Sequence, residues 1–76
     1  LGKYGMMRKE FLAQNHQMLY NKMALSEDLY SHCKKIEDYA NVWKNEIVKC
    51  CIAKGHNIRS AYDIADEIII HDLILV

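Results

Sequence analysis

The chain has 76 residues, of which 51% are hydrophobic, and its ten basic and ten acidic side chains give a formal net charge of zero. The apolar content exceeds that of disordered chains, and the zero charge argues against a strongly basic nucleic-acid-binding domain. A chain this short buries only about 60% of its unfolded surface, which leaves room for one small domain. The absence of proline and the presence of only three glycines favour helices over a β fold. We therefore expect an all-α fold, with one domain over residues 1–76.

Two short helices are predicted in the basic head, which we define as residues 1–25. The first, Lys3–Gln14, would bury apolar side chains spaced by three and four, namely Tyr4, Met7 and Phe11. The second, Gln17–Leu25, would bury Leu19, Tyr20 and Met23. Asn15-His16 marks the joint between them.

The longest helix is predicted from Glu27 to Lys54, with Ser26 as its N-cap and Gly55 closing its C-terminus. Apolar residues within it alternate spacings of four and three, namely Leu29, Cys33, Ile36, Ala40, Trp43, Ile47 and Cys50. Such a heptad stripe predicts a helix docked in a bundle, with Trp43 as the core anchor.

A second long helix is predicted after a short Gly55-His56 turn, with Asn57 as its N-cap. Its apolar stripe comprises Ala61, Ile64, Ala65, Ile68 and Leu75. The short turn predicts that residues 26–76 form an antiparallel helical hairpin on which the two N-terminal helices pack. The two stripes together exceed what a monomer needs to bury. We therefore expect a homodimer whose interface contains Ala61, Ala65, Ile68 and Leu75.

The order of residues in the N-terminal half is distinctive. Tyr4 lies between Gly2 and Gly5, Arg8-Lys9 precedes Phe11-Leu12, and a regular series follows, namely Leu19-Tyr20, Leu25-Ser26, Leu29-Tyr30, His32 and Ile36-Glu37. This succession resembles the TnpV family of small proteins encoded on bacterial transposons and mobilisable elements.

A second block of the chain also resembles this family. Asn57-Ile58-Arg59 and the segment 66–74 are similar to its closing segment, whereas the middle, residues 38–56, is shorter than in the family. Glu27-Asp28 stands where the family tends to have Gly-Lys. The resemblance implies a mobile-element protein and brings no reaction, cofactor or partner with it.

Three cysteines and four histidines raise the question of a metal site. Cys33 and Cys50 would lie roughly 25 Å apart along one helix at about 1.5 Å per residue, so they cannot share an ion. The vicinal Cys50-Cys51 pair, even with His56, is poor zinc geometry. We interpret Cys33 and Cys50, at positions of the apolar stripe, as small buried hydrophobic residues, and we expect a protein of the reducing cytoplasm.

Catalysis is not expected either. A carboxylate–histidine cluster formed by Asp63, Glu67 and His71, with Asp66 beside it, is interpreted as a solvated acidic helix face. No Gly-x-Ser-x-Gly motif or glycine-rich phosphate loop occurs. We expect no enzyme activity, no metal and no cofactor, and no apolar run approaches the roughly 20 residues of a membrane span.

Charge is unevenly distributed along the chain. Residues 1–25 hold four basic side chains against one acidic, and residues 57–76 hold one basic side chain against four acidic. The ends could pack together, copies could associate head to tail, or the head could meet an acidic partner. Candidate contacts to nucleic acid or to an acidic partner are Lys3, Arg8 and Lys9.

These observations favour a non-catalytic accessory protein of a mobile element that acts through protein–protein contacts. Two alternatives remain open. One is a DNA-binding accessory or regulatory factor in transposition, and the other is an inhibitor of a host defence protein.

Overall fold

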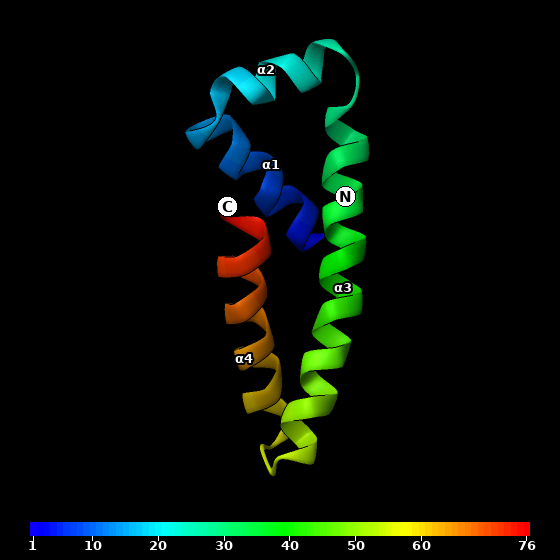
Figure 1. Cartoon of the computed structure of the whole chain (residues 1–76), viewed down its shortest axis with the longest axis vertical. Coiled ribbons are helices and arrows are strands. Elements are labelled where there is room, and N and C mark those ends of the chain that lie inside the picture. Colours follow the sequence, from blue (N-terminus) through cyan, green and yellow to red (C-terminus); the bar gives the residue numbers. More distant parts are fainter.

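The computed structural model describes all of residues 1–76 and shows an elongated, all-helical molecule with principal dimensions of 47 × 19 × 14 Å (Figure 1). The elements in chain order are α1 (Lys3–Asn15), α2 (Gln17–Leu25), α3 (Leu29–Ala53), α4 (Ile58–Ile69) and a π-helical turn, η1 (Ile70–Ile74). The all-α prediction is confirmed. The first three helices begin and end within two residues of their predicted bounds.

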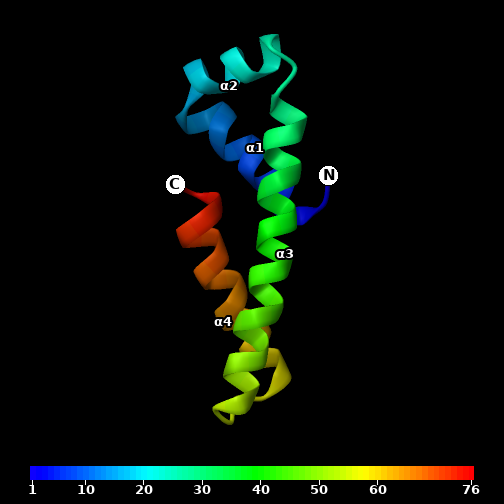
Figure 2. The same ribbon diagram turned by 45° about the vertical axis from the view of Figure 1, so that its right-hand side comes forward.

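Helices α3 and α4 run side by side in opposite directions (Figures 1 and 2). The amide of Gly55 donates to the carbonyl of Ile52 at 3.0 Å, and that of His56 donates to the carbonyl of Cys51 at 3.1 Å. With Gly55 at a φ of 97°, these bonds form the Schellman motif that closes a helix. Asn57 then accepts a hydrogen bond from the Ser60 amide at 2.8 Å and caps α4. The predicted turn and N-cap are therefore confirmed.

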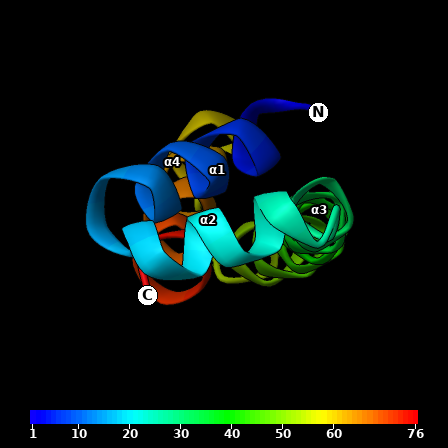
Figure 3. The ribbon, with the colours of Figure 1, turned by 90° about the horizontal axis from the view of Figure 1, so that it is seen from above.

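Helix α1 packs on the N-terminal half of α3, above the C-terminal end of α4, and α2 crosses the end of the molecule from α1 to α3 (Figures 1 and 3). No residue of α2 is fully buried. The predicted burial of Leu19 is wrong, while Tyr20 and Met23 are half-buried. The physical reason is that α2 bridges the end of the hairpin and has no helix on its far side.

The core consists of two clusters of buried side chains. One lies where α1 meets α3 and the C-terminal turn, and contains Tyr4, Ala40, Ile69 and Ile74. The other lies between α3 and α4 nearer the hairpin turn, and contains Val48, Cys51, Ala61 and Ala65. The hairpin thus has its own core, and α1 completes the core at the other end.

The buried face of α3 differs from the predicted heptad stripe. It includes Cys33, Glu37, Ala40, Val48 and Cys51. Cys33 and Cys51 are separated by five turns at about 3.6 residues per turn, whereas a heptad stripe drifts by about 20° per repeat on a straight helix. Cys33 and Ala40 of the predicted stripe are buried, and Ile36 and Ile47 pack at the edge of the core, but the drift turns Trp43 and Cys50 out of it.

Trp43 is the largest side chain that this rotation moves out of the core. It is 38% exposed and belongs to neither core cluster. The next residue, Lys44, takes the inward direction and is half-buried. The prediction that Trp43 anchors the core is therefore wrong, and Cys50, predicted to be buried, is likewise exposed.

The π-helical turn at the end of α4 changes which residues face the core. The amide of Leu75 donates to the carbonyl of Ile70 at 2.9 Å, five residues back. This wider turn keeps Ile69 and Ile74 on the same side, and both are fully buried. Leu75, which an uninterrupted α-helical pattern places on the apolar stripe, is 41% exposed instead.

The connection between α2 and α3 also differs from its prediction. The Ser26 hydroxyl donates to the carbonyl of Lys22 at 3.0 Å, so Ser26 ends α2 and is not the N-cap of α3. The amide of Asp28 donates to the carbonyl of Met23 at 2.8 Å. The amide of Glu27 donates to the carbonyl of Ala24 at 3.3 Å. Together with the bond from Asp28 it forms a second Schellman motif, in which Glu27, at a φ of 62°, occupies the position that glycine usually takes.

This geometry predicts that Glu27→Gly stabilises the protein. A left-handed conformation costs an L-residue about 1–2 kcal/mol, and the greater freedom of glycine in the unfolded chain offsets about 0.5–1 kcal/mol of that relief. We expect a net gain of up to about 1 kcal/mol in urea unfolding followed by circular dichroism. Glu27→Ala keeps the strained backbone and is the control. A glycine variant no more stable than the alanine variant would contradict the prediction.

Candidate functional site

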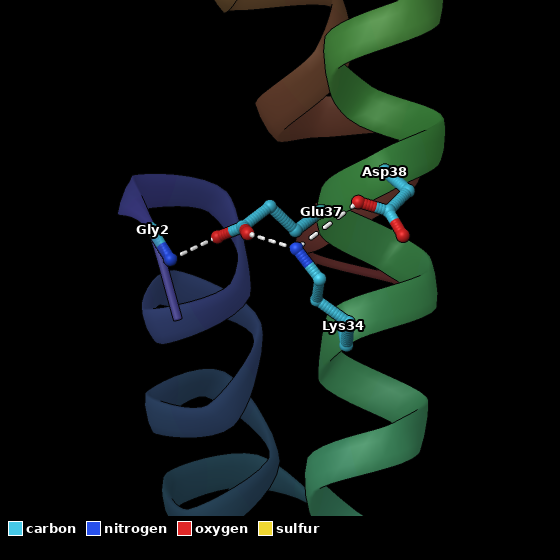
Figure 4. A network of polar contacts seen from close by, with 4 residues as sticks. All are labelled: Gly2, Lys34, Glu37 and Asp38. Carbon is cyan, nitrogen blue, oxygen red and sulfur yellow. Dashed lines mark hydrogen bonds and ion pairs between the residues drawn. The ribbon is translucent and has the colours of Figure 1, made fainter.

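The buried carboxylate of Glu37 on α3 holds the N-terminus of the basic head against this helix. Glu37 is buried, accepts a hydrogen bond from the Gly2 amide, and lies 3.4 Å from the Lys34 ammonium, which also pairs with Asp38 at 3.3 Å (Figure 4). A negative charge at the N-terminus of α1 is favourable because it meets the positive end of the helix dipole. A Cβ added at Gly5 would lie 3.2 Å from the main-chain oxygen of Cys33, which shows that α1 and α3 lie close together at this position.

Arg8 does not form part of an exposed basic surface. Its exposed fraction is 9%, and its Nη1 donates to the main-chain oxygens of Ile74 at 2.9 Å and Val76 at 2.6 Å. Its Nε donates to Nε2 of His32 at 3.3 Å. The guanidinium therefore caps the C-terminal end of the last helical segment, where a positive charge is favoured. The prediction of Arg8 as a contact for nucleic acid or for an acidic partner is wrong in this structure.

Lys3 and Tyr4 bind the acidic end of the same chain. Lys3 pairs with Asp66 at 3.1 Å, and the Tyr4 hydroxyl donates to the other oxygen of this carboxylate. Lys44 lies over the rings of Tyr4 and Tyr62, 5.5 and 5.4 Å from their centroids. The head and the acidic tail thus pack together within one molecule, which is the first of the three interpretations of the charge asymmetry.

The ionisation of Tyr4 and Asp66 follows from this arrangement. Burial, and then the hydrogen bond to Asp66, raise the pKa of the Tyr4 hydroxyl. Burial opposes ionisation of Asp66, but hydrogen bonds from Tyr4 and Lys3 and the charges of Lys3 and Lys44 outweigh it and lower the pKa of this carboxyl. Of the three candidate basic residues, only Lys9 has no polar partner in the structure.

Cys33 and His32 lie next to the Arg8 guanidinium. Burial raises the pKa of the Cys33 thiol, although Arg8 and Lys9 oppose the shift. A buried thiol with a raised pKa is a poor nucleophile, so the interpretation of Cys33 as a buried hydrophobic residue is confirmed. Burial, and then the positive charges of Arg8 and Lys35, lower the pKa of His32. Neutral His32 can accept the hydrogen bond that Arg8 Nε–H donates.

The His32 environment predicts a pH dependence of stability. Since its pKa in the folded protein lies below the usual value of 6.5, the unfolded chain binds more protons just below pH 6.5. The contribution of His32 to stability is therefore complete above pH 6.5 and is lost as the pH falls through this value. Asp66, whose pKa is lowered from 3.8, adds a separate loss at more acidic pH.

The measurement is the urea midpoint between pH 7.5 and about pH 5, within the window that the histidine controls. We expect His32→Gln, which keeps an acceptor for Arg8, to flatten the decline of the midpoint. His71→Gln, on an exposed position, is the matched control. A variant at His32 that declines as steeply as wild type would refute the assignment.

The residues predicted for a dimer interface lie elsewhere in the fold. Ala61 and Ala65 are fully buried between α3 and α4, Ile68 is half-buried, and Leu75 is exposed. Two small residues on α4 allow α3 to lie close to it. Ala61 and Ala65 therefore belong to the core of the monomer, and their assignment to the interface is wrong.

The candidate chemical clusters do not converge on a site. Asp63, Glu67 and His71 are exposed on α4. No three His, Cys, Asp or Glu side chains lie close enough to hold one metal ion. The cysteines are all free.

Exposed apolar side chains are the surface feature that stands out. The accessible surface is 5280 Å², against roughly 4800 Å² expected for a compact monomer of this mass. Met18 and Leu25 on α2 are 89% and 86% exposed, and Tyr39 and Val42 on α3 are 69% and 64% exposed. These two surfaces are the candidate interaction sites.

Sequence reasoning did not single out Tyr39 and Val42. A signal was nevertheless present, because the series Lys35, Tyr39, Val42 and Glu46 repeats at spacings of four, three and four. This is a helical period out of phase with the core residues Cys33 and Ala40. Choosing between the two faces required knowing which one α1 and α4 cover.

The comparisons with known proteins place the chain in a family. None of its helices is both long and apolar enough to cross a membrane. The chain has no significant match among the curated proteins or the solved structures. The family model described as transposon-encoded protein TnpV matches residues 1–74, and so covers the head, the hairpin and the middle segment between the two similar blocks. The chain therefore belongs to the TnpV family of transposon-encoded proteins.

Proposed function

We propose that the protein is a non-catalytic accessory protein of a mobile element that acts by contact with protein. Membership of a transposon-encoded family supports the genetic setting. The observation that carries the proposal is the exposure of large apolar side chains on α2 and on the outer face of α3. Apolar surface of this kind on a small folded protein is typical of a protein–protein interaction site.

The electrostatics of the head support protein as the partner in preference to DNA. Binding to phosphates requires several cations free to contact them. Arg8 is buried against main-chain oxygens, and Lys3 already pairs with Asp66. Lys9 is then the one member of the predicted basic cluster without a polar partner, and the chain as a whole is neutral.

Fluorescence anisotropy with labelled duplex DNA at two salt concentrations tests this choice. We expect wild-type protein to bind no more tightly than the roughly 10⁻⁴–10⁻⁶ M of non-specific contacts at physiological salt. We also expect the double variant Lys3→Gln, Lys9→Gln to behave like wild type. Sub-micromolar, sequence-selective binding that this variant weakens would overturn the proposal in favour of a DNA-binding factor.

A further inference from the structure

Four residues define the outer face of α3, namely Lys35, Tyr39, Val42 and Glu46. At about 100° per residue they lie within about 60° of arc, on the side opposite the buried residues Cys33 and Ala40. All four are exposed, and the structure offers no helix to cover them. A hollow of about 260 Å³ lies beside them, lined by Lys35, Asp38, Tyr39 and Val42.

The charges of these four residues are complementary to those of a second copy of the same face that runs in the opposite direction. A basic residue lies at one end, an acidic residue at the other, and two apolar residues lie between them. Lys35 and Glu46 are equally distant from the midpoint between Ala40 and Asn41, and so are Tyr39 and Val42. We propose that the outer face of α3 binds the same face of a second copy of this chain, antiparallel, about a two-fold axis at that midpoint.

Such a dimer forms two identical charge pairs. Lys35 of one copy lies opposite Glu46 of the second copy, and the symmetry repeats the contact at the other end. Neither residue has an ion-pair partner within the monomer, whereas the neighbouring Lys34 pairs with both Glu37 and Asp38. The two charges on this face therefore remain available to a partner.

In the same symmetric dimer, the second copy covers the apolar residues at the centre of the face. Tyr39 lies opposite Val42 of the second copy. Trp43, which is turned out of the core, lies on the Tyr39 side of the face, and there it meets Tyr39 of the second copy. Aromatic side chains at the centre of an interface, flanked by charged residues, are the usual arrangement of such contacts.

Helix α2 is the competing apolar surface, and it lacks this complementarity. Met18 and Leu25 are highly exposed, but the only charged residue of α2 is Lys22. A second copy of α2 would bring two like charges together without an acidic partner. Charge complementarity thus selects α3 for self-association.

The size of the contact sets the expected affinity. The 25 residues of α3 extend about 37 Å at about 1.5 Å per residue. A contact along one helix face falls in the class of small interfaces, below about 1,200 Å² in total, which form weak or transient complexes. We therefore expect the dimer to have a dissociation constant in the micromolar range. The inference rests on the proposed function in that it names the protein partner.

Charge reversal gives a sharp test by sedimentation equilibrium over micromolar to millimolar protein concentrations. Lys35→Glu and Glu46→Lys should each raise the dimer dissociation constant about tenfold, because each replaces two attractive pairs by two repulsive ones. The double variant K35E/E46K restores both pairs in reversed order and should return within about threefold of wild type. Circular dichroism should show unchanged helicity in all three variants, since both positions are exposed.

Two further variants separate this surface from the alternatives. Val42→Glu should weaken the dimer at least about tenfold, because it places a charge at the apolar centre. Leu25→Glu on α2 should leave it unchanged. A dimer that Leu25→Glu dissociates, or that the double charge reversal fails to restore, would overturn the proposal. A wild type that remains monomeric throughout would also overturn it, but would leave the proposed function intact, which only tight DNA binding contradicts.

Discussion

Replacing Ile69 by alanine is expected to lower the free energy of unfolding by about 2–5 kcal/mol, as truncations of large buried aliphatic residues do. Ile69 is fully buried and packs in the cluster with Tyr4, Ala40 and Ile74, where three helical segments meet. A domain of this length has a total stability of about 4–11 kcal/mol at typical values per residue. The expected loss is therefore a large fraction of the total stability, about half of it at the middle of both ranges.

The matched control is Ile58→Ala on the same helix, where the side chain is 63% exposed. We expect it to change the free energy of unfolding by less than about 1 kcal/mol. Urea unfolding of both variants, followed by circular dichroism at a low protein concentration, gives the comparison. Equal losses at Ile58 and Ile69 would contradict the buried cluster.

The elements of this fold were predictable because their end signals are local. Gly55 adopts a positive φ that other residues avoid, and Asn57 supplies the carbonyl that the first amides of α4 need. Both effects depend on neighbours within a few residues. The hairpin therefore follows from the sequence alone, as does the division into four helices.

The rotation of the long helix was not predictable from spacing. Cys33, Ile36, Ala40, Trp43 and Ile47 satisfy a heptad repeat, while Cys33, Glu37, Ala40, Lys44 and Val48 satisfy the natural period of a straight helix equally well. The first series is more apolar, so the sequence pattern favours it. In the structure Glu37 and Lys44 of the second series face inward, where they contact the Gly2 amide before α1 and the rings of Tyr4 and Tyr62, while Ile36 and Ile47 pack at the edge of the core.

The candidate site shows the same distinction between local and distant information. Arg8 and Lys9 are adjacent and both basic, so the sequence gives no reason to separate them. The structure does, because only Arg8 faces the end of a helix that lies more than 60 residues away along the chain. A contact between such distant residues leaves no periodic signal. The exposure of the outer face of α3 could not be predicted for the same reason, since it depends on which helices cover the inner face.

Replacing Arg8 by methionine is the second change with a large expected effect. Methionine keeps most of the apolar stem but removes every donor, so the main-chain oxygens of Ile74 and Val76 and the acceptor of His32 lose their partner. Leaving a buried acceptor without a donor costs about 1–3 kcal/mol. We expect a loss of that size in the free energy of unfolding. Because the donors hold the C-terminal turn on α1, amide hydrogen exchange should rise first in residues 70–76.

Two variants at the same place decide whether the capping geometry is responsible. Arg8→Lys keeps the charge but lacks the planar guanidinium, whose donors contact two oxygens and His32 at once. It should therefore recover only part of the loss. Lys9→Met removes a neighbouring charge that has no polar partner and should change stability by less than about 0.5 kcal/mol. If Arg8→Met proved as mild as Lys9→Met, the guanidinium could not be the cap of the final helix, and its charge would be free to meet an external partner after all.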